Sequence, residues 1–319
     1  MAVLFWIVVV ALLAGALWLG RNALITRRLA ADAERQIPRI GKSVTIGGDA
    51  IHYVDEGAGR PILFVHGLGG QLHHFRHTLF PAMGEGFRLL AMDRPGSGYS
   101  TRVSSGARLP QQAEAIAKFI DAIGLDRPLL VGHSLGGAIA LRVALDHPDK
   151  ISGLALISPL THYVPTPPKE FGGLYIRSPL MRRIIAATLA VPAGLKTAQQ
   201  TLDFVFGPQP VPADYAIGGG GYLGLRPSHF YATSSDIVAV EQDLPGQMER
   251  YGEIAMPVGI LFGSRDRVLH HTRHGLAMEG RIEGIDIEIL EGIGHMPQFV
   301  EAGKVATFVR RMAGKAFGG

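Results

Sequence analysis

The stretch LLVGHSLGGAIALRVA, residues 129–144, decides the fold of this chain. Its apolar start ends at a short turn, and an apolar pattern with helical spacing follows. Serine is a weak helix former because its hydroxyl competes for nearby backbone hydrogen bonds, so Ser134 fits the turn. Residues 132–136 read Gly-His-Ser-Leu-Gly, which matches G-x-S-x-G between a strand and a helix. In that setting the serine oxygen stands above the sheet beside the next N–H, that of Leu135. The stretch predicts a nucleophile at Ser134.

Apolar runs alternate with helical patterns on both sides of this turn. Near-continuous apolar runs suit strands that are covered on both faces, as in a parallel sheet. Strands and helices in alternation are typical of a doubly wound α/β sheet. Residues 43–48 and 50–57 predict an additional antiparallel pair joined near Gly47 and Gly48. The other predicted strands lie at 61–67, 87–93, 128–133, 151–158, 257–263 and 285–290, and the predicted helices at 111–123, 135–146 and 302–313.

The alternation of strand and helix patterns stops over residues 160–236, which contain many prolines and the glycine run 218–221. A structureless loop of that length is uncommon in a compact domain, so an inserted, mainly helical cap is expected. Short helices are predicted near 179–190 and 195–206, and residues 41–159 and 237–319 then form the core. The aromatic residues of the insert could line a pocket, but for each one a place in the insert's own small core is favoured. These residues are Phe171, Tyr175, Phe204, Phe206, Tyr215, Tyr222, Phe230 and Tyr231.

The N-terminus is apolar and uncharged from Ala2 to Gly20. This length suffices for one transmembrane helix, whereas a cleaved signal peptide would have a positive start and a shorter apolar region. Residues 1–40 are therefore interpreted as a membrane anchor, in contact with lipid through residues 2–20, followed by a basic linker. The arginines that follow the span place the protein body on the cytoplasmic side by the positive-inside tendency. They are Arg21, Arg27, Arg28, Arg35 and Arg39.

Composition narrows the function classes. The formal net charge is +4, but the basic residues cluster only after the apolar N-terminus, so membrane contact explains them better than nucleic acid does. The chain has no cysteine, which excludes disulfides, thiolate metal sites and cysteine nucleophiles. His270 and His274 have the spacing of a helical metal pair, but no third ligand follows by spacing. No metal, no other cofactor and no nucleic-acid partner are expected.

Two further segments make the chain resemble the α/β-hydrolase family over residues 43–315. His66-Gly67-Leu68-Gly69-Gly70 is similar to the family's oxyanion loop, which implies that the Leu68 N–H is the second oxyanion donor beside that of Leu135. DRPGSGYS, residues 93–100, is similar to a segment of members with a cap, where it is structural. Asp93 is therefore expected to form a turn and to take no part in catalysis.

The resemblance also implies the other members of a catalytic triad. Asp266 lies in GSRDRVL, where the family keeps its triad acid, and His295 lies in EGIGHMPQFVE, where the family keeps its base. The order Ser134, Asp266, His295 is the order expected for this fold. An imidazole can take the serine proton, and a carboxylate fixes the imidazole tautomer and stabilises the imidazolium. Replacement of Asp236 or Asp243 by asparagine is expected to leave kcat nearly unchanged.

The resemblance favours a serine hydrolase that cleaves carboxylic esters, and a membrane anchor favours lipophilic ones. Related epoxide hydrolases and haloalkane dehalogenases have aspartate at the nucleophile position, so Ser134 argues against both. C–C bond hydrolysis and lactone hydrolysis remain alternatives on the same fold. A membrane-tethered binding protein without chemistry is the non-enzymatic alternative. Deletion of residues 1–40 is expected to release a soluble hydrolase.

Overall fold

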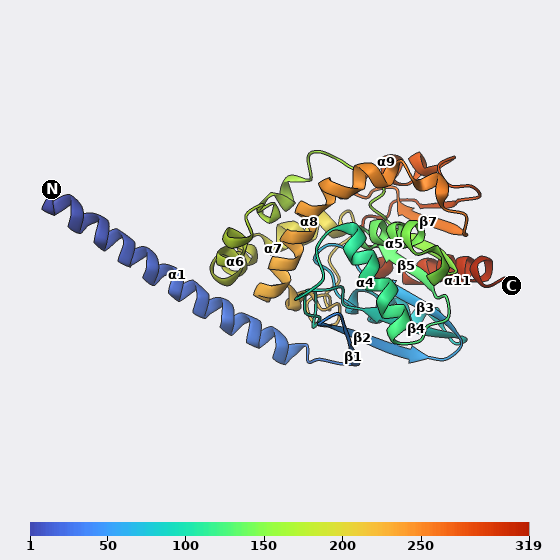
Figure 1. Ribbon diagram of the computed structural model, residues 1–319, viewed down its shortest axis with the longest axis horizontal. Helices are drawn as coiled ribbons and strands as arrows, with labels where there is room; N and C mark the ends of the chain where they lie inside the picture. Colours follow the sequence, from blue (N-terminus) through green and yellow to red (C-terminus); the bar gives the residue numbers. More distant parts are fainter. Residues whose placement is uncertain (319) are drawn as a thin grey trace.

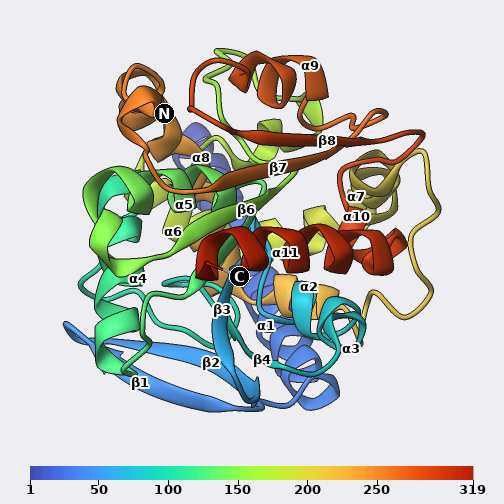
Figure 2. The same cartoon turned by 90° about the vertical axis from the view of Figure 1, so that its right-hand side faces the viewer.

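The computed structural model describes residues 1–318, and its centre is an eight-stranded sheet (Figures 1 and 2). The strand order is β1-β2-β4-β3-β5-β6-β7-β8; β1 and β2 pair antiparallel, β2 and β4 pair antiparallel, and all other neighbours are parallel. The predicted mostly parallel sheet is confirmed, including the antiparallel pair at its edge. The strands are β1 (Lys42–Ile46), β2 (Asp49–Gly57), β3 (Arg60–Val65), β4 (Phe87–Met92), β5 (Leu129–His133), β6 (Gly153–Ile157), β7 (Val258–Gly263) and β8 (Asp286–Leu290).

Helices cover both faces of the sheet. α4 (Leu109–Ala122) and α5 (Leu135–Asp146) pack on one face, and their buried side chains share one apolar cluster with the strands. α2 (His73–Arg76), α3 (Leu79–Met83) and α11 (Ala302–Phe317) contribute to the cluster on the other face (Figure 2). The short helices α9 (His271–His274) and α10 (Pro297–Val300) follow β7 and β8. All of β5, β6 and β7 is buried, as expected for strands between two helical layers.

The cap lies between β6 and β7. It contains the 3₁₀ turns η2 (Lys169–Leu174) and η3 (Gly221–Leu225) and the helices α6 (Pro179–Thr188), α7 (Ala190–Phe206) and α8 (Pro227–Met248). The sequence indicates α6 and α7 but not α8, because prolines, serines and β-branched residues hide its helical pattern. The boundary expected at residue 236 falls inside α8, so one helix belongs to both the cap and the core.

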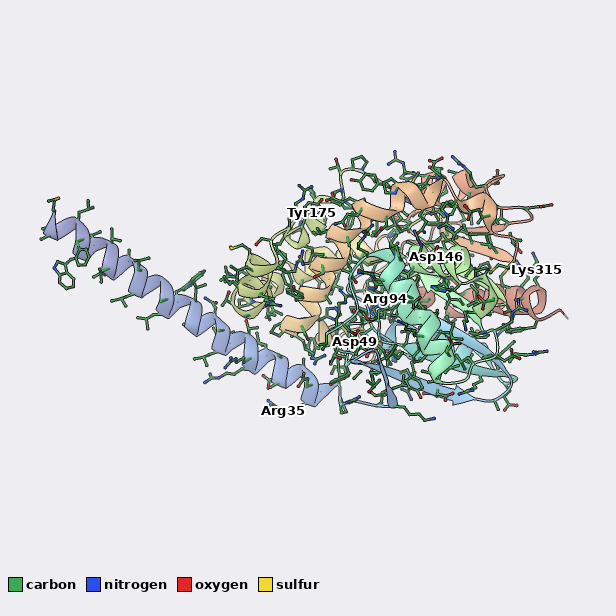
Figure 3. All side chains as sticks on the ribbon, in the orientation of Figure 1. Arg35, Asp49, Arg94, Asp146, Tyr175 and Lys315 are labelled. Carbon is green, nitrogen blue, oxygen red and sulfur yellow. The ribbon has the colours of Figure 1, made fainter. Side chains whose placement is uncertain are left out.

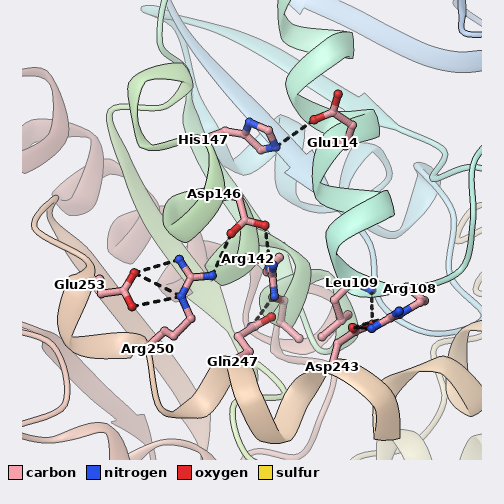
Figure 4. Close-up of polar contacts among 11 residues, drawn as sticks. Arg108, Leu109, Glu114, Arg142, Asp146, His147, Asp243, Gln247, Arg250 and Glu253 are labelled. Carbon is pink, nitrogen blue, oxygen red and sulfur yellow. Dashed lines mark hydrogen bonds and ion pairs between the residues drawn. The ribbon is translucent and has the colours of Figure 1, made fainter.

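Side-chain contacts fasten the C-terminal half of α8 to the core helices (Figure 4). The Arg108 guanidinium, just before α4, donates to the Asp243 carboxylate from Nε at 3.0 Å. Gln247 donates to the Ala138 carbonyl in α5 at 2.9 Å. Arg250, just after α8, forms an ion pair of 3.0 Å with Asp146 at the end of α5. Because Asp243 is buried in this connection, its replacement by asparagine is expected to lower the stability of the fold.

α1 (Ala2–Gln36) is one continuous helix that extends from the body (Figure 1). Its first half is long and apolar enough to cross a membrane, and none of that apolar window is buried. Its second half packs on the cap: Asn22, Thr26 and Ala33 are buried, and Glu34 forms an ion pair of 2.7 Å with Arg226. Residues 21–36 are therefore a docked helix where the sequence indicated a linker, and removal of residues 1–40 would uncover part of the cap.

Two truncations distinguish the halves of α1. Deleting residues 2–20 is expected to leave the melting temperature of the body unchanged, because none of these residues is buried. Deleting residues 2–36 is expected to lower it, because the cap then loses its contacts with Thr26, Ala33 and Glu34. In domains of roughly 150–250 residues, each kcal/mol lost lowers Tm by about 2–4 °C. Calorimetry in a mild detergent measures both, and equal melting temperatures would contradict the docking of α1.

Candidate active site

Ser134 lies on the sharp turn between β5 and α5. Its φ of 54° is in the left-handed region, which a side chain with Cβ adopts only when the surroundings enforce it. The Ser134 N–H donates to the Ile157 carbonyl of β6 at 3.1 Å, which holds the turn against the sheet. A Cβ on Gly136 would lie 2.2 Å from the Val65 carbonyl oxygen, so only glycine permits this approach of α5 to β3. The predicted turn at the serine is present.

Asp266 and His295 are in direct contact. One carboxylate oxygen, Oδ2 of Asp266, accepts a hydrogen bond of 2.7 Å from Nδ1 of His295. The other, Oδ1, accepts from the Val268 and Leu269 N–H groups at 2.8 and 2.9 Å. The carboxylate is therefore held at both oxygens, and Nε2 of the imidazole remains for a second partner. His295 lines the same cavity as Ser134, and His133, the residue before Ser134, contacts the His295 carbonyl at 3.0 Å.

The loops that carry the acid and the base also bind each other. The Arg265 N–H donates to the Ile293 carbonyl at 2.8 Å, and the Gly292 N–H donates to the Ser264 hydroxyl at 2.9 Å. These bonds join the ends of β7 and β8, which are neighbours in the sheet. The distance between Asp266 and His295 is thus set by backbone contacts as well as by their own hydrogen bond.

Arg94, which is labelled in Figure 3, binds the backbone of the loop His66–Gly70. The Arg94 guanidinium donates to the His66 and Gly67 carbonyls, both at 2.9 Å. Because a trans peptide points its C=O and N–H in opposite directions, this contact turns the Leu68 N–H away from Arg94. Leu68, Ser134 and Leu135 line one cavity, and Leu135 begins α5, where its N–H has no acceptor within the helix. The two residues expected to form an oxyanion hole are thus on the wall of one cavity.

A buried ion pair connects Arg94 to the cap helix α8. Arg94 is 1% exposed, and its Nη1 atom lies 2.8 Å from Oδ2 of Asp236. The other oxygen of Asp236, Oδ1, lies 2.8 Å from Nη2 of Arg102 and forms a second ion pair. A second contact comes from the same helix, since His229 donates to the Gly69 carbonyl at 3.0 Å. The cap therefore supports the loop His66–Gly70 at two points. The sequence indicated neither contact. Replacement of Asp236 is expected to lower stability because this carboxylate balances two buried guanidinium groups.

Asp93 has the structural position that was expected. Its Oδ1 accepts from the Leu72 N–H and its Oδ2 from the Tyr99 N–H, both at 2.8 Å, while His52 contacts Oδ2 at 2.7 Å. These bonds shape the loop after β4, and Asp93 is not among the residues that line the cavity.

The cavity above Ser134 has a volume of about 1130 Å³ and lies between the core and the cap. Its wall is mostly apolar and includes six of the eight aromatic residues named from the sequence, together with Tyr163 of the same insert. The preference for a place in the insert's own core is therefore wrong for five of these six. Tyr215 does both: it lines the cavity and packs against the buried Phe206, which clusters with Met296 and Phe299. The six that line the cavity are Phe171, Tyr175, Phe204, Tyr215, Tyr222 and Phe230.

Histidines near the site are kept neutral by burial. Burial lowers the pKa of His74 and of His274 to about 3, and both rings line the cavity without charge at neutral pH. Burial also holds the pKa of His133 well below its usual range, and its Nε2 donates to the His295 carbonyl at 3.0 Å. His133 thus positions the loop of the base. Among residues 1–318, no group of three or more metal-binding side chains is present, and His270 and His274 have no third partner there.

Residues 60–302 match the alpha/beta hydrolase fold family, and this chain belongs to that family. It is 26% identical to the dihydrolipoyllysine-residue acetyltransferase component of the acetoin cleaving system of Cupriavidus necator, over 84% of this chain and 68% of that protein. It is 25% identical to the 2-hydroxy-6-oxo-6-phenylhexa-2,4-dienoate hydrolase of Comamonas testosteroni, over 79% of this chain and 87% of that protein.

Among solved structures, a membrane phospholipase A described as a bacterial virulence factor is similar with a TM-score of 0.67. Its sequence identity is 25%, and the match covers 98% of this chain and 97% of that chain. A share of 98% includes α1, so the similarity extends beyond the hydrolase body.

Replacing Asp236 tests the support of the oxyanion loop. The change Asp236→Asn leaves the charges of Arg94 and Arg102 buried without a counter-ion, so the free energy of unfolding is expected to fall by about 3 kcal/mol or more. Chemical denaturation measures this loss. The control is Asp126→Asn at an exposed position, expected within about 0.5 kcal/mol of the parent protein. Equal stability of the two variants would contradict the role assigned to the buried pair.

Proposed function

We propose that this protein is a membrane-anchored serine hydrolase that cleaves carboxylic esters, with Ser134 as nucleophile, His295 as base and Asp266 as orienting acid. The observation that carries the proposal is the hydrogen bond from His295 to Asp266, with His295 on the wall of the cavity that Ser134 also lines. The family assignment supports hydrolysis as the reaction type.

In the proposed reaction, Oγ of Ser134 attacks the ester carbonyl carbon while Nε2 of His295 takes the hydroxyl proton. Asp266 holds Nδ1–H and stabilises the imidazolium. The N–H groups of Leu68 and Leu135 stabilise the oxyanion. His295 then protonates the leaving alcohol, which leaves an acyl group on Ser134. A water molecule, deprotonated by His295, releases the acid and restores the serine.

Two observations support lipophilic esters as substrates. The cavity wall is apolar and aromatic, which suits an acyl chain better than a charged group. A membrane phospholipase A is similar over nearly the whole chain, α1 included. In this proposal α1 crosses a membrane through residues 2–20, and Arg21, Arg27 and Arg28 hold the hydrolase body on the cytoplasmic side.

C–C bond hydrolysis is the second candidate, because a 2-hydroxy-6-oxo-6-phenylhexa-2,4-dienoate hydrolase is similar over 79% of this chain. A series of p-nitrophenyl esters from acetyl to palmitoyl, run beside that dienoate, separates the two. Ester turnover with no dienoate cleavage supports the proposal, and the reverse result supports the alternative. A lactone substrate in the same series tests lactone hydrolysis.

Replacing the triad residues tests the mechanism. Ser134→Ala and His295→Ala are each expected to remove nearly all ester turnover while the protein stays folded. Because the residues act as a unit, the double variant should be scarcely worse than either single one. Additive losses would overturn the assignment. Labelling by a fluorophosphonate probe, lost in Ser134→Ala, tests the alternative of a binding protein, since an unreactive serine in the parent protein would support that alternative.

The acid has its own test. Asp266→Asn is expected to lower kcat on the order of 10⁴-fold, because an amide at this position no longer favours the required imidazole tautomer. Circular dichroism checks that the fold is retained, and Asp126→Asn is the matched control with full activity expected. Retention of kcat in Asp266→Asn would show that the acid lies elsewhere.

A further inference from the structure

The exposed apolar side chains of the body are concentrated on the cap. In residues 37–318, eight large apolar side chains are exposed, and six of them belong to the cap; the other two are Val103 and Leu276. Leu180, Met181 and Ile184 of α6 are 66%, 48% and 41% exposed, and their spacing puts them on one side of the helix. Leu195 in the first half of α7, which packs on α6, is 44% exposed. These four residues are called the cap face below.

The cap face lies beside the apolar part of α1. α6 packs on α1, where the Thr26 hydroxyl donates to the Thr188 carbonyl at 3.4 Å. Figure 1 shows α6 at the end of the body from which the free half of α1 projects. Exposed apolar surface therefore continues from α1, with Trp18 and Leu24 both more than half exposed, onto α6.

The segment that carries the cap face is charged only by cations. Residues 171–202 contain no aspartate or glutamate, and their four cations are Arg177, Arg182, Arg183 and Lys196. Arg183 and Lys196 are exposed, as are Arg27 and Arg28 on the adjoining part of α1. Within residues 1–318, none of these four exposed cations forms an ion pair with a carboxylate, whereas Arg177 pairs with Glu241. Apolar side chains ringed by unpaired cations match an anionic lipid surface.

The cavity wall and the cap face share a residue. Leu195 of the cap face lines the cavity and is 44% exposed, and Tyr222 in η3 lines it and is 37% exposed. The cavity wall therefore includes side chains that reach the molecular surface at the cap face. A lipid that leaves the bilayer here would move from one apolar environment into another.

We propose that the cap face docks on an anionic phospholipid bilayer beside the α1 span, so that the cavity opens against the lipid and receives its substrate from the membrane. This inference deepens the proposed function and rests on it for the identity of the substrate. The occupant is the bilayer because the surface continues from α1 and is cationic; a second copy of the chain would bring the same cations together.

Site-specific labelling tests the docking. The chain has no cysteine, so Leu180→Cys in the full-length protein gives a single attachment point for an environment-sensitive fluorophore. In vesicles of phosphatidylcholine and phosphatidylglycerol, the label at residue 180 is expected to be quenched by nitroxide-bearing lipids. A label at Val103→Cys, which is exposed but outside the cap, is the control and should stay unquenched. Equal quenching at both positions, or none at residue 180, would overturn the proposal.

Self-association through the cap face is a separate outcome of the same experiment. Unlabelled Leu180→Cys protein that forms disulfide-linked dimers, combined with no quenching of the labelled protein by lipid, would assign the cap face to contact between two copies and overturn docking on lipid. Replacing Arg183 and Lys196 together by glutamate should reduce the quenching in anionic vesicles. An unchanged signal in that double variant would contradict the electrostatic part of the proposal.

Turnover of a vesicle-dissolved ester and of a water-soluble ester distinguishes a defect in membrane docking from a defect in ester hydrolysis. Leu180→Gln with Ile184→Gln is expected to lower turnover of an ester dissolved in vesicles by about tenfold, while turnover of p-nitrophenyl butyrate stays unchanged because neither residue lines the cavity. Val103→Gln should change neither activity. An equal loss on both substrates would contradict docking. Absence of ester turnover in the parent protein would refute the proposed function, and the quenching result would still decide the docking.

Discussion

The ion pair and hydrogen bonds of the buried Arg94 guanidinium connect the core, the cap and the loop His66–Gly70. Arg94 is 1% exposed, and a charge buried to this degree requires a counter-ion and hydrogen-bond acceptors for its N–H groups. These partners come from α4, from α8 and from the loop after β3. Asp236 of α8 supplies the negative charge, and the carbonyls of His66 and Gly67 accept hydrogen bonds from the guanidinium. Since those carbonyls set the direction of the Leu68 N–H, the position of the cap helix is coupled to the candidate oxyanion hole.

The sheet, the turn at Ser134 and the loops that carry Asp266 and His295 could be predicted because their signals are local. A strand covered on both faces must be apolar along its length, as 128–133 and 257–263 are, and the turn at Ser134 needs glycines within two residues. α8 and its contacts could not be predicted in this way. Asp236 and Asp243 resemble ordinary surface acids in the sequence, and only the approach of Arg94 and Arg108 from distant segments gives them a role.

In the N-terminal helix, too, the sequence predicts the feature that depends on local composition but not the feature that depends on tertiary contacts. The apolar length of residues 2–20 is visible directly, and the interpretation as an anchor follows from it. Asn22 and Thr26 are polar and look like the start of a linker, yet both are buried where α1 meets the cap. Their burial depends on the surfaces of α6 and η3, which no periodicity within residues 21–36 reveals.

These contacts form a continuous connection from α1 to the catalytic loop. Glu34 near the end of α1 pairs with Arg226, whose guanidinium also lies 5.0 Å from the centre of the Tyr99 ring. Arg226 directly precedes α8, and α8 carries His229 and Asp236, the two residues that support the oxyanion loop. α1 is therefore joined through Arg226 and α8 to the loop His66–Gly70, which carries the Leu68 N–H. Because Arg226, His229 and Asp236 lie on one helix or directly before it, the contacts of α1 and those of this loop share a single support.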